Sequence, residues 1–173
     1  LGLFNQQPMG FYSPETLKED ARRHDIRTLN PDVDRSLELC TVEEGAIRLG
    51  LCYVRDVGAV GARAIVAARE NRGSFRSLAE FMERTGLLRE ELESLAQAGA
   101  LDGFDPDRRA LRWEIGLRYR PVGKQLGLAL PVGQDVASLL PMNPGEEMEG
   151  EYHALGMYPR GHIMANLRPT LPE

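Results

Sequence analysis

The chain has 173 residues and a formal net charge of −5 at pH 7, with 42% apolar and 27% charged side chains. These values are ordinary for a globular protein, and they argue against a general nucleic-acid binder and against intrinsic disorder. No apolar run approaches the roughly 18 residues that a membrane span needs, and no signal peptide is visible, so we expect a piece of a longer cytoplasmic protein without membrane contact. Cys40 and Cys52 lack metal-ligand spacing and are expected to be free thiols.

Positive charge is concentrated in one part of the sequence. Between Arg48 and Arg89 there are eight arginines against four carboxylates, a balance of +4, whereas the rest of the chain carries −9. We expect this to be the only cationic region and the place where phosphate groups would bind. The alternative is an Arg-rich helical face that is simply solvated.

Two local signals precede this region. Ser13 followed by Pro14 predicts a helix start, and Leu17 and Ala21 lie on one face of that helix. The segments 37–42 and 46–51 flank a Glu-Glu-Gly turn and predict a short β-hairpin.

The stretch from 50 to 75 predicts a glycine turn followed by a helix. The turn contains Gly58 and Gly61, and apolar residues recur at helical spacing from about Val60 onward. Free amides at a helix N-terminus bind anions, and Arg63 would reach the same phosphate from the side. The alternative interpretation is a connection between helices without a binding role.

A second unit of the same form follows. Ser77 predicts a helix N-cap, Phe81 and Met82 belong to the apolar face that follows, and the helix ends near Gly86. A third helix with Leu92 on its apolar face ends at Gly99. The arrangement of helix, turn and helix thus occurs twice, which predicts two packed units. Two such copies are harder to obtain by chance than a single copy.

The remaining segments carry weaker signals. A helix is expected from Asp105-Pro106 to about Tyr119, with Trp113 and Leu117 buried, because a large aromatic residue is more often core than a base-stacking platform. The segment 121–145 is rich in Pro and Gly and predicts a linker or a long loop, and 146–155 predicts a final helix.

Catalytic chemistry finds no support in the pattern. Asp32 and Asp34 have the D-x-D form of a two-metal site, but they follow Asn-Pro in a strong turn sequence, where acids cap backbone amides. The three histidines are scattered, and no nucleophile with its base can be assembled. We therefore expect no catalytic residue and no metal or cofactor in this chain.

Several stretches resemble the bacterial C-family replicative polymerases, that is, the DNA polymerase III alpha subunit and its error-prone relatives. The stretches are NQQPMGFYSPETLKEDARRH, IRTLNPDVDRS, AIRLGL, AQAGALDGFDPDRRALRWE and EYHALGMYPRGHIMANLRP. The glycine turns resemble the tandem helix-hairpin-helix domain of that family. The sequence departs from the family at Ile163, where Pro is usual, and at Asp56, where Gly is frequent and where a carboxylate would weaken phosphate binding. The region from Arg108 to Tyr119 and the short tail resemble the error-prone type more than the main replicase.

The resemblance implies a mainly α fold with a small β-hairpin and a tandem helix-hairpin-helix core. The implied divisions are 1–45 as the end of the polymerase fingers, 46–120 as the DNA-binding domain, and 121–173 as a linker and helical segment. The implied role is sequence-independent binding of duplex DNA in replication or error-prone repair synthesis, within a polymerase that uses Mg²⁺ and contacts its own other domains. A protein-interaction or structural module is the alternative. The residues expected to bind DNA are Arg55, Val57, Gly58, Val60, Gly61, Arg63, Gly86 and Arg89.

Overall fold

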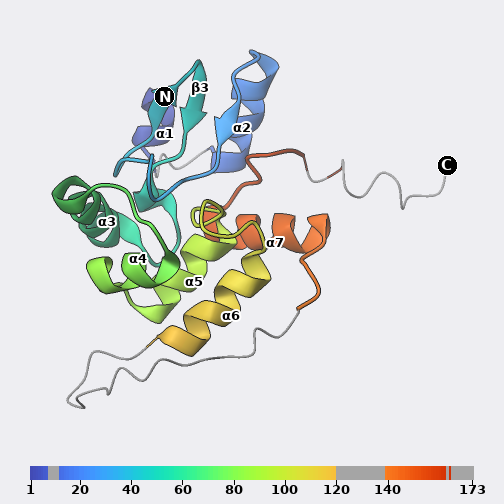
Figure 1. Ribbon diagram of the computed structural model, residues 1–173. Coiled ribbons are helices and arrows are strands. Elements are labelled where there is room, and N and C mark those ends of the chain that lie inside the picture. The colour runs from blue at the N-terminus through green and yellow to red at the C-terminus, as the bar shows by residue number, and fades with distance from the viewer. Residues whose placement is uncertain (8–11, 120–138, 163, 165–173) are drawn as a thin grey trace.

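The computed structural model describes residues 1–7, 12–119, 139–162 and 164. Figure 1 shows a small sheet with two short helices at one end of the molecule and a group of packed helices below it. The elements in chain order are α1 (Gly2–Asn5), α2 (Pro14–Arg23), β1 (Thr28–Leu29), β2 (Thr41–Glu43), β3 (Ala46–Arg48), the 3-10 helix η1 (Leu51–Tyr53), α3 (Gly58–Arg72), α4 (Leu78–Thr85), α5 (Arg89–Gln97), α6 (Arg108–Arg118) and α7 (Pro144–Leu155). The expected fold class, mainly helical with a small β element, is confirmed.

The predicted β-hairpin is present but shorter than expected. β2 and β3 pair antiparallel with Val42 opposite Ile47, and the turn between them has Glu44 and Gly45 at positive φ. β1, which was not predicted, pairs in parallel with β3 and places Thr28 opposite Ile47. The sheet order is therefore β1-β3-β2. A strand of two residues carries too little periodicity to be recognised from sequence.

The helices of the repeated unit begin and end at the predicted signals. Ser77 accepts a hydrogen bond from the Glu80 amide at the start of α4, and Gly86 ends α4 in the left-handed conformation. Phe81 is fully buried and stacks edge-on against Phe75, with ring centroids 5.0 Å apart. Leu92 of α5 is 1% exposed. The two predicted core anchors are confirmed.

The expectation for α6 is wrong in its buried face. Asp107 caps the helix, and Leu111 and Ile115 point into the core. Trp113 is instead 47% exposed, and Leu117 is only partly buried. Leu111 and Ile115 have the same i, i+4 spacing as Trp113 and Leu117, so periodicity within the helix could not choose between the two faces.

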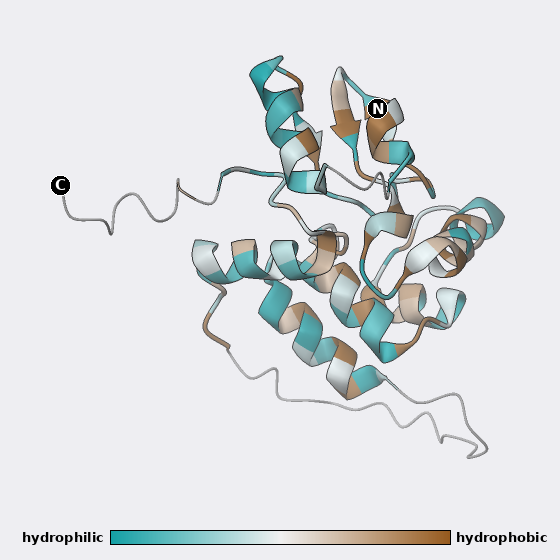
Figure 2. Ribbon diagram, turned by 180° about the vertical axis from the view of Figure 1, so that it is seen from behind, coloured by the Kyte–Doolittle hydropathy of each residue, from teal (hydrophilic) through white to brown (hydrophobic). Residues whose placement is uncertain are grey.

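One hydrophobic core joins the whole described chain. It extends from Phe4 of α1 to Met157 beyond α7 and includes residues of α2, β3, η1 and every helix from α3 to α7. Figure 2 shows the amphipathic helices, with brown and teal stretches alternating along the ribbons. α7 packs against α5, and the Arg55 amide donates to the Ala154 carbonyl at 2.8 Å. The packing thus crosses the sequence positions at which domains were expected to divide. Most of the predicted linker lies outside the described residues.

Candidate nucleic-acid interface

The N-terminus of α3 presents free backbone amides. Gly58 has φ +54°, which turns the chain from η1 into the helix, and the space where a Cβ would sit is empty. The N-cap residue Val57 offers no side-chain oxygen, and the first turn contains no acidic residue. In the described part of the chain, the amides of Ala59 and Val60 donate to no other group. Their donors and the positive end of the helix dipole therefore face solvent.

Gly61 has a different role from the one that we expected. Its amide donates to the Val57 carbonyl at 3.1 Å, so it is engaged within the helix. A Cβ at Gly61 would lie 2.9 Å from Val57 Cγ1 and 2.8 Å from Glu91 Oε1. Gly61 therefore permits the close approach of α3 to the start of α5. The Gly58 amide makes a long contact, 3.5 Å, with the Val54 carbonyl.

Arg55 and Arg63 lie on either side of this helix start in the sequence. Both side chains are exposed, and Arg55 Nη1 lies 3.5 Å from His153 Nε2. Arg63 Nη1 donates to Glu38 Oε1 at 3.1 Å. Exposed ion pairs are worth about 0–1 kcal/mol, so the Glu38 contact does not prevent Arg63 from binding a phosphate.

The second hairpin is not equivalent to the first. The Gly86 amide donates to the Met82 carbonyl at 3.1 Å and ends α4. Glu91 accepts a hydrogen bond from the Leu88 amide at 2.6 Å, and Glu90 and Glu91 occupy the first turn of α5. Arg89 pairs with Glu93, which raises the pKa of its guanidinium. Acidic side chains thus already occupy the positive end of this helix.

Asp56 is the position where the sequence departs from the usual glycine. It adopts φ +65°, a conformation that Asp tolerates better than most residues. Its Oδ2 accepts a hydrogen bond from Ser94 Oγ at 2.9 Å. The carboxylate therefore links the first hairpin to α5.

Asp32 and Asp34 each accept a hydrogen bond from a backbone amide. Asp32 Oδ1 accepts from the Asp34 amide at 2.8 Å, and Asp34 Oδ1 accepts from the Phe75 amide at 3.0 Å. Both carboxylates cap backbone amides, as the turn sequence predicts. No cluster of three or more His, Cys, Asp or Glu suited to a metal ion occurs among the residues that the structure describes.

The two cysteines are unpaired thiols. Burial raises the pKa of Cys40, and burial also raises the pKa of Cys52 to about 11. Both thiols are therefore protonated at neutral pH, which makes them weak nucleophiles. Within the described ranges, no helix has the length and apolar character needed to cross a membrane.

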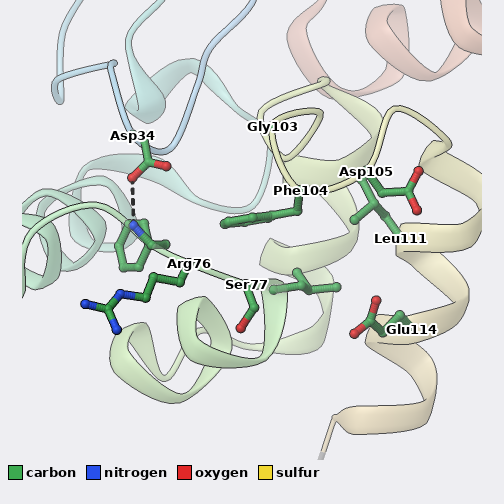
Figure 3. Close-up of a pocket in the computed structure, with 10 residues that line it drawn as sticks. Asp34, Arg76, Ser77, Gly103, Phe104, Asp105, Leu111 and Glu114 are labelled. Carbon is green, nitrogen blue, oxygen red and sulfur yellow. Dashed lines mark hydrogen bonds between the residues drawn. The ribbon is translucent and has the colours of Figure 1, made fainter.

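A pocket lies between the start of α4, the loop after α5, and α6 (Figure 3). Phe104 lies across its centre, and Arg76 extends away from it. Its carboxylates are engaged within the protein, because Asp105 accepts from the Asp107 amide at 2.8 Å and Glu114 pairs with Arg118. Both carboxylates thus already have a partner within the protein.

A second group of arginines lies on α6, outside the region 48–89. α6 carries four arginines against one glutamate, but Arg108, Arg109 and Arg118 each pair with a carboxylate. Arg108 is buried, whereas Arg112 is exposed beside Trp113. The spacing of the arginines in RRALRWEIGLR was the available signal.

Residues 25–111 match the family described as "Helix-hairpin-helix motif", and the chain belongs to this family. Its relatives include the error-prone DNA polymerases of Dechloromonas aromatica (37% identity over 177 residues), Pseudomonas fluorescens (37% over 187 residues) and Corynebacterium diphtheriae (42% over 116 residues). These alignments cover 99%, 98% and 67% of this chain but only 17%, 18% and 11% of the respective relatives. The resemblance to the C-family polymerases is thereby confirmed, and these relatives carry the error-prone name.

Proposed function

We propose that this chain is a non-catalytic, DNA-binding part of a DNA polymerase that acts in replication or error-prone repair synthesis. It holds duplex DNA by the phosphate backbone and does not read base sequence. The single observation that carries the proposal is the N-terminus of α3, where the amides of Ala59 and Val60 are free and the first turn contains no acidic residue. Helix N-termini of this kind bind phosphate oxygens.

The first hairpin supports this role better than the second. Arg55 and Arg63 supply exposed positive charge near the free amides of α3. At the second hairpin, the Gly86 amide is already engaged, and Glu90 and Glu91 occupy the first turn of α5. The phosphate contact therefore centres on Gly58 to Val60, and the start of α5 serves mainly to hold the first hairpin in place.

Nucleotide transfer with Mg²⁺ is assigned to the larger polymerase and to residues other than Asp32 and Asp34, since these two carboxylates cap amides. A cytoplasmic location and contacts with other polymerase domains belong to the same proposal.

A titration of labelled duplex DNA at two salt concentrations tests the DNA-binding role. Dissociation constants of roughly 10⁻⁴–10⁻⁶ M are expected at physiological salt, without dependence on sequence. Arg63→Ala should weaken binding to every duplex and flatten the salt slope by about one unit. Arg72→Ala is the matched control, because it removes the same charge from the exposed end of α3, roughly 13 Å from Arg63 along the helix.

The alternative is a module that only joins protein domains. The acidic first turn of α5 is the observation in its favour, because it makes the second hairpin a structural joint. The result that favours this alternative is that Arg63→Ala and Arg72→Ala bind every duplex with the same affinity and salt slope as the unmodified chain. Both hairpins would then be structural joints.

A further inference from the structure

Trp113 is the only tryptophan of the chain, and it stands on the solvent side of α6. Its side chain points away from the buried face that Leu111 and Ile115 form. It is 47% exposed, and it takes part in no ring contact or hydrogen bond with the rest of the described chain. An indole has a large apolar surface, so this exposure leaves a large apolar area open to solvent.

Two arginines lie near the exposed indole, and Glu114 follows it directly in the sequence. Arg112 precedes it, is exposed, and has no ionic partner among the described residues. Gly116 lies one turn further on, on the same side of the helix as both residues. Arg89 of α5, which is half-exposed and paired with Glu93, approaches this point, because a Cβ at Gly116 would lie 3.7 Å from Arg89 Nη2. The absence of a side chain at Gly116 lets the Arg89 guanidinium approach α6 one turn from Trp113.

This surface is separate from the N-terminus of α3, although both adjoin the start of α5. Gly61 of α3 contacts Glu91 and Leu87, while Arg89 in between faces α6. α5 and α6 pack side by side, as Figure 1 shows. The two surfaces therefore lie on either side of the first turn of α5.

We propose that Trp113, with Arg112 and Arg89, forms a binding site for an unpaired nucleotide of single-stranded DNA. The base stacks on the indole, and the two guanidinium groups bind the adjacent phosphates. Stacking on an aromatic side chain requires a free base face, which a single strand offers and a duplex does not, and it is tolerant of base identity. The site does not depend on the hairpin proposal, since none of its groups belongs to α3.

Fluorescence tests this site directly because Trp113 is the only indole in the protein. Titration of the chain with a twelve-nucleotide oligo(dT) should quench the emission of Trp113 in a saturable way. An equal concentration of blunt duplex should quench it much less. Heparin provides the control for a polyanion without bases, and it should leave the emission nearly unchanged.

Anisotropy of labelled oligo(dT) provides the second measurement. Trp113→Ala should weaken single-strand binding by about 5- to 100-fold, and Trp113→Phe should recover most of the loss. Arg112→Ala should flatten the salt slope by about one unit. Tyr12→Ala is the matched control, because Tyr12 is an aromatic residue with 61% exposure in a different part of the chain.

Three results would overturn the proposal. The first is unchanged emission at saturating oligo(dT), and the second is equal quenching by heparin. The third is an equal loss of single-strand and duplex affinity in Trp113→Ala, or no loss of either, as a protein-docking surface would give. Failure of the hairpin proposal looks different, because Arg63→Ala would then leave duplex affinity unchanged while Trp113 is still quenched by oligo(dT).

Discussion

Arg108 of α6 and Glu151 of α7 form an ion pair inside the protein, with 2.9 Å between Nη1 and Oε1 and side-chain exposures of 2% and 0%. Arg108 also pairs with Asp102 at 2.8 Å, and Glu151 pairs with Arg160 at 2.7 Å. This network connects α7 to the end of α5 and to α6. It makes α7 part of the same folded unit as the two hairpins.

Replacement of Arg108 by Met should therefore destabilise the chain strongly. The change leaves Glu151 buried with only the half-exposed Arg160 as a partner, and breaking a buried pair costs about 3–5 kcal/mol. Urea denaturation measures the free energy of unfolding. The double variant Arg108→Met, Glu151→Leu should be more stable than Arg108→Met alone, since it removes the buried carboxylate as well. A double variant no more stable than the single one would argue against charge burial as the cause.

The two central apolar residues of the hairpin domain should dominate its stability. Phe81→Ala should cost about 3–5 kcal/mol and Leu92→Ala about 2–5 kcal/mol, because each leaves a cavity in a close-packed interior. Leu88→Ala is the control, since Leu88 is 57% exposed and should change the free energy of unfolding by less than about 0.5 kcal/mol. Losses below that value at both core positions would show that the core lies elsewhere.

Glu38 should limit DNA binding by competing for Arg63. Glu38→Gln removes the exposed ion pair at 3.1 Å and should raise duplex affinity about 2- to 5-fold, with little change in stability. Glu70→Gln removes the same charge from α3 and controls for net charge. The effect of Glu38→Gln should disappear in an Arg63→Ala background. A gain that persists there would show that Glu38 acts on DNA through another group.

Glu43 should titrate far below an ordinary glutamate. Arg48, at 2.8 Å, and then Arg35, at 2.9 Å, hold the pKa of Glu43 at about 2. Because the folded-state pKa is lowered, the stabilisation is present above the unfolded-state pKa of about 4.3 and is lost as the pH falls toward 2. NMR titration of the side-chain carboxyl measures this pKa. Arg48→Met should return it most of the way to the ordinary value, and Arg35→Met should raise it less; an ordinary pKa in the unmodified chain would contradict the geometry.

The parts of the fold that depend on neighbouring residues could be read from the sequence. Ser77 and Gly86 mark the two ends of α4, because a hydroxyl that accepts from a helix amide and a residue with positive φ act locally. Phe81 and Leu92 were identified as core because each lies in the middle of an apolar stripe. The family resemblance was equally visible, since it rests on residue identities alone.

The face of α6 was not determined by its own sequence. Leu111 with Ile115 and Trp113 with Leu117 are two apolar stripes of equal spacing, and only the positions of α5 and α7 decide which one is buried. β1 was missed for a related reason, because its two residues gain their partner from β3, which lies 19 residues further along the chain.

In the candidate site, too, some features follow from local sequence and others from tertiary contacts. The sequence by itself determined that glycine turns and helix starts carry arginines in a tandem helix-hairpin-helix pattern. Only the tertiary structure decided which amides are free, because Gly61 is needed for packing against α5, and Gly86 and Glu91 complete hydrogen bonds of their own. The physical reason is that a donor or a charge is available to a ligand only when no other part of the folded chain has already paired with it, and that pairing is set by contacts distant in sequence.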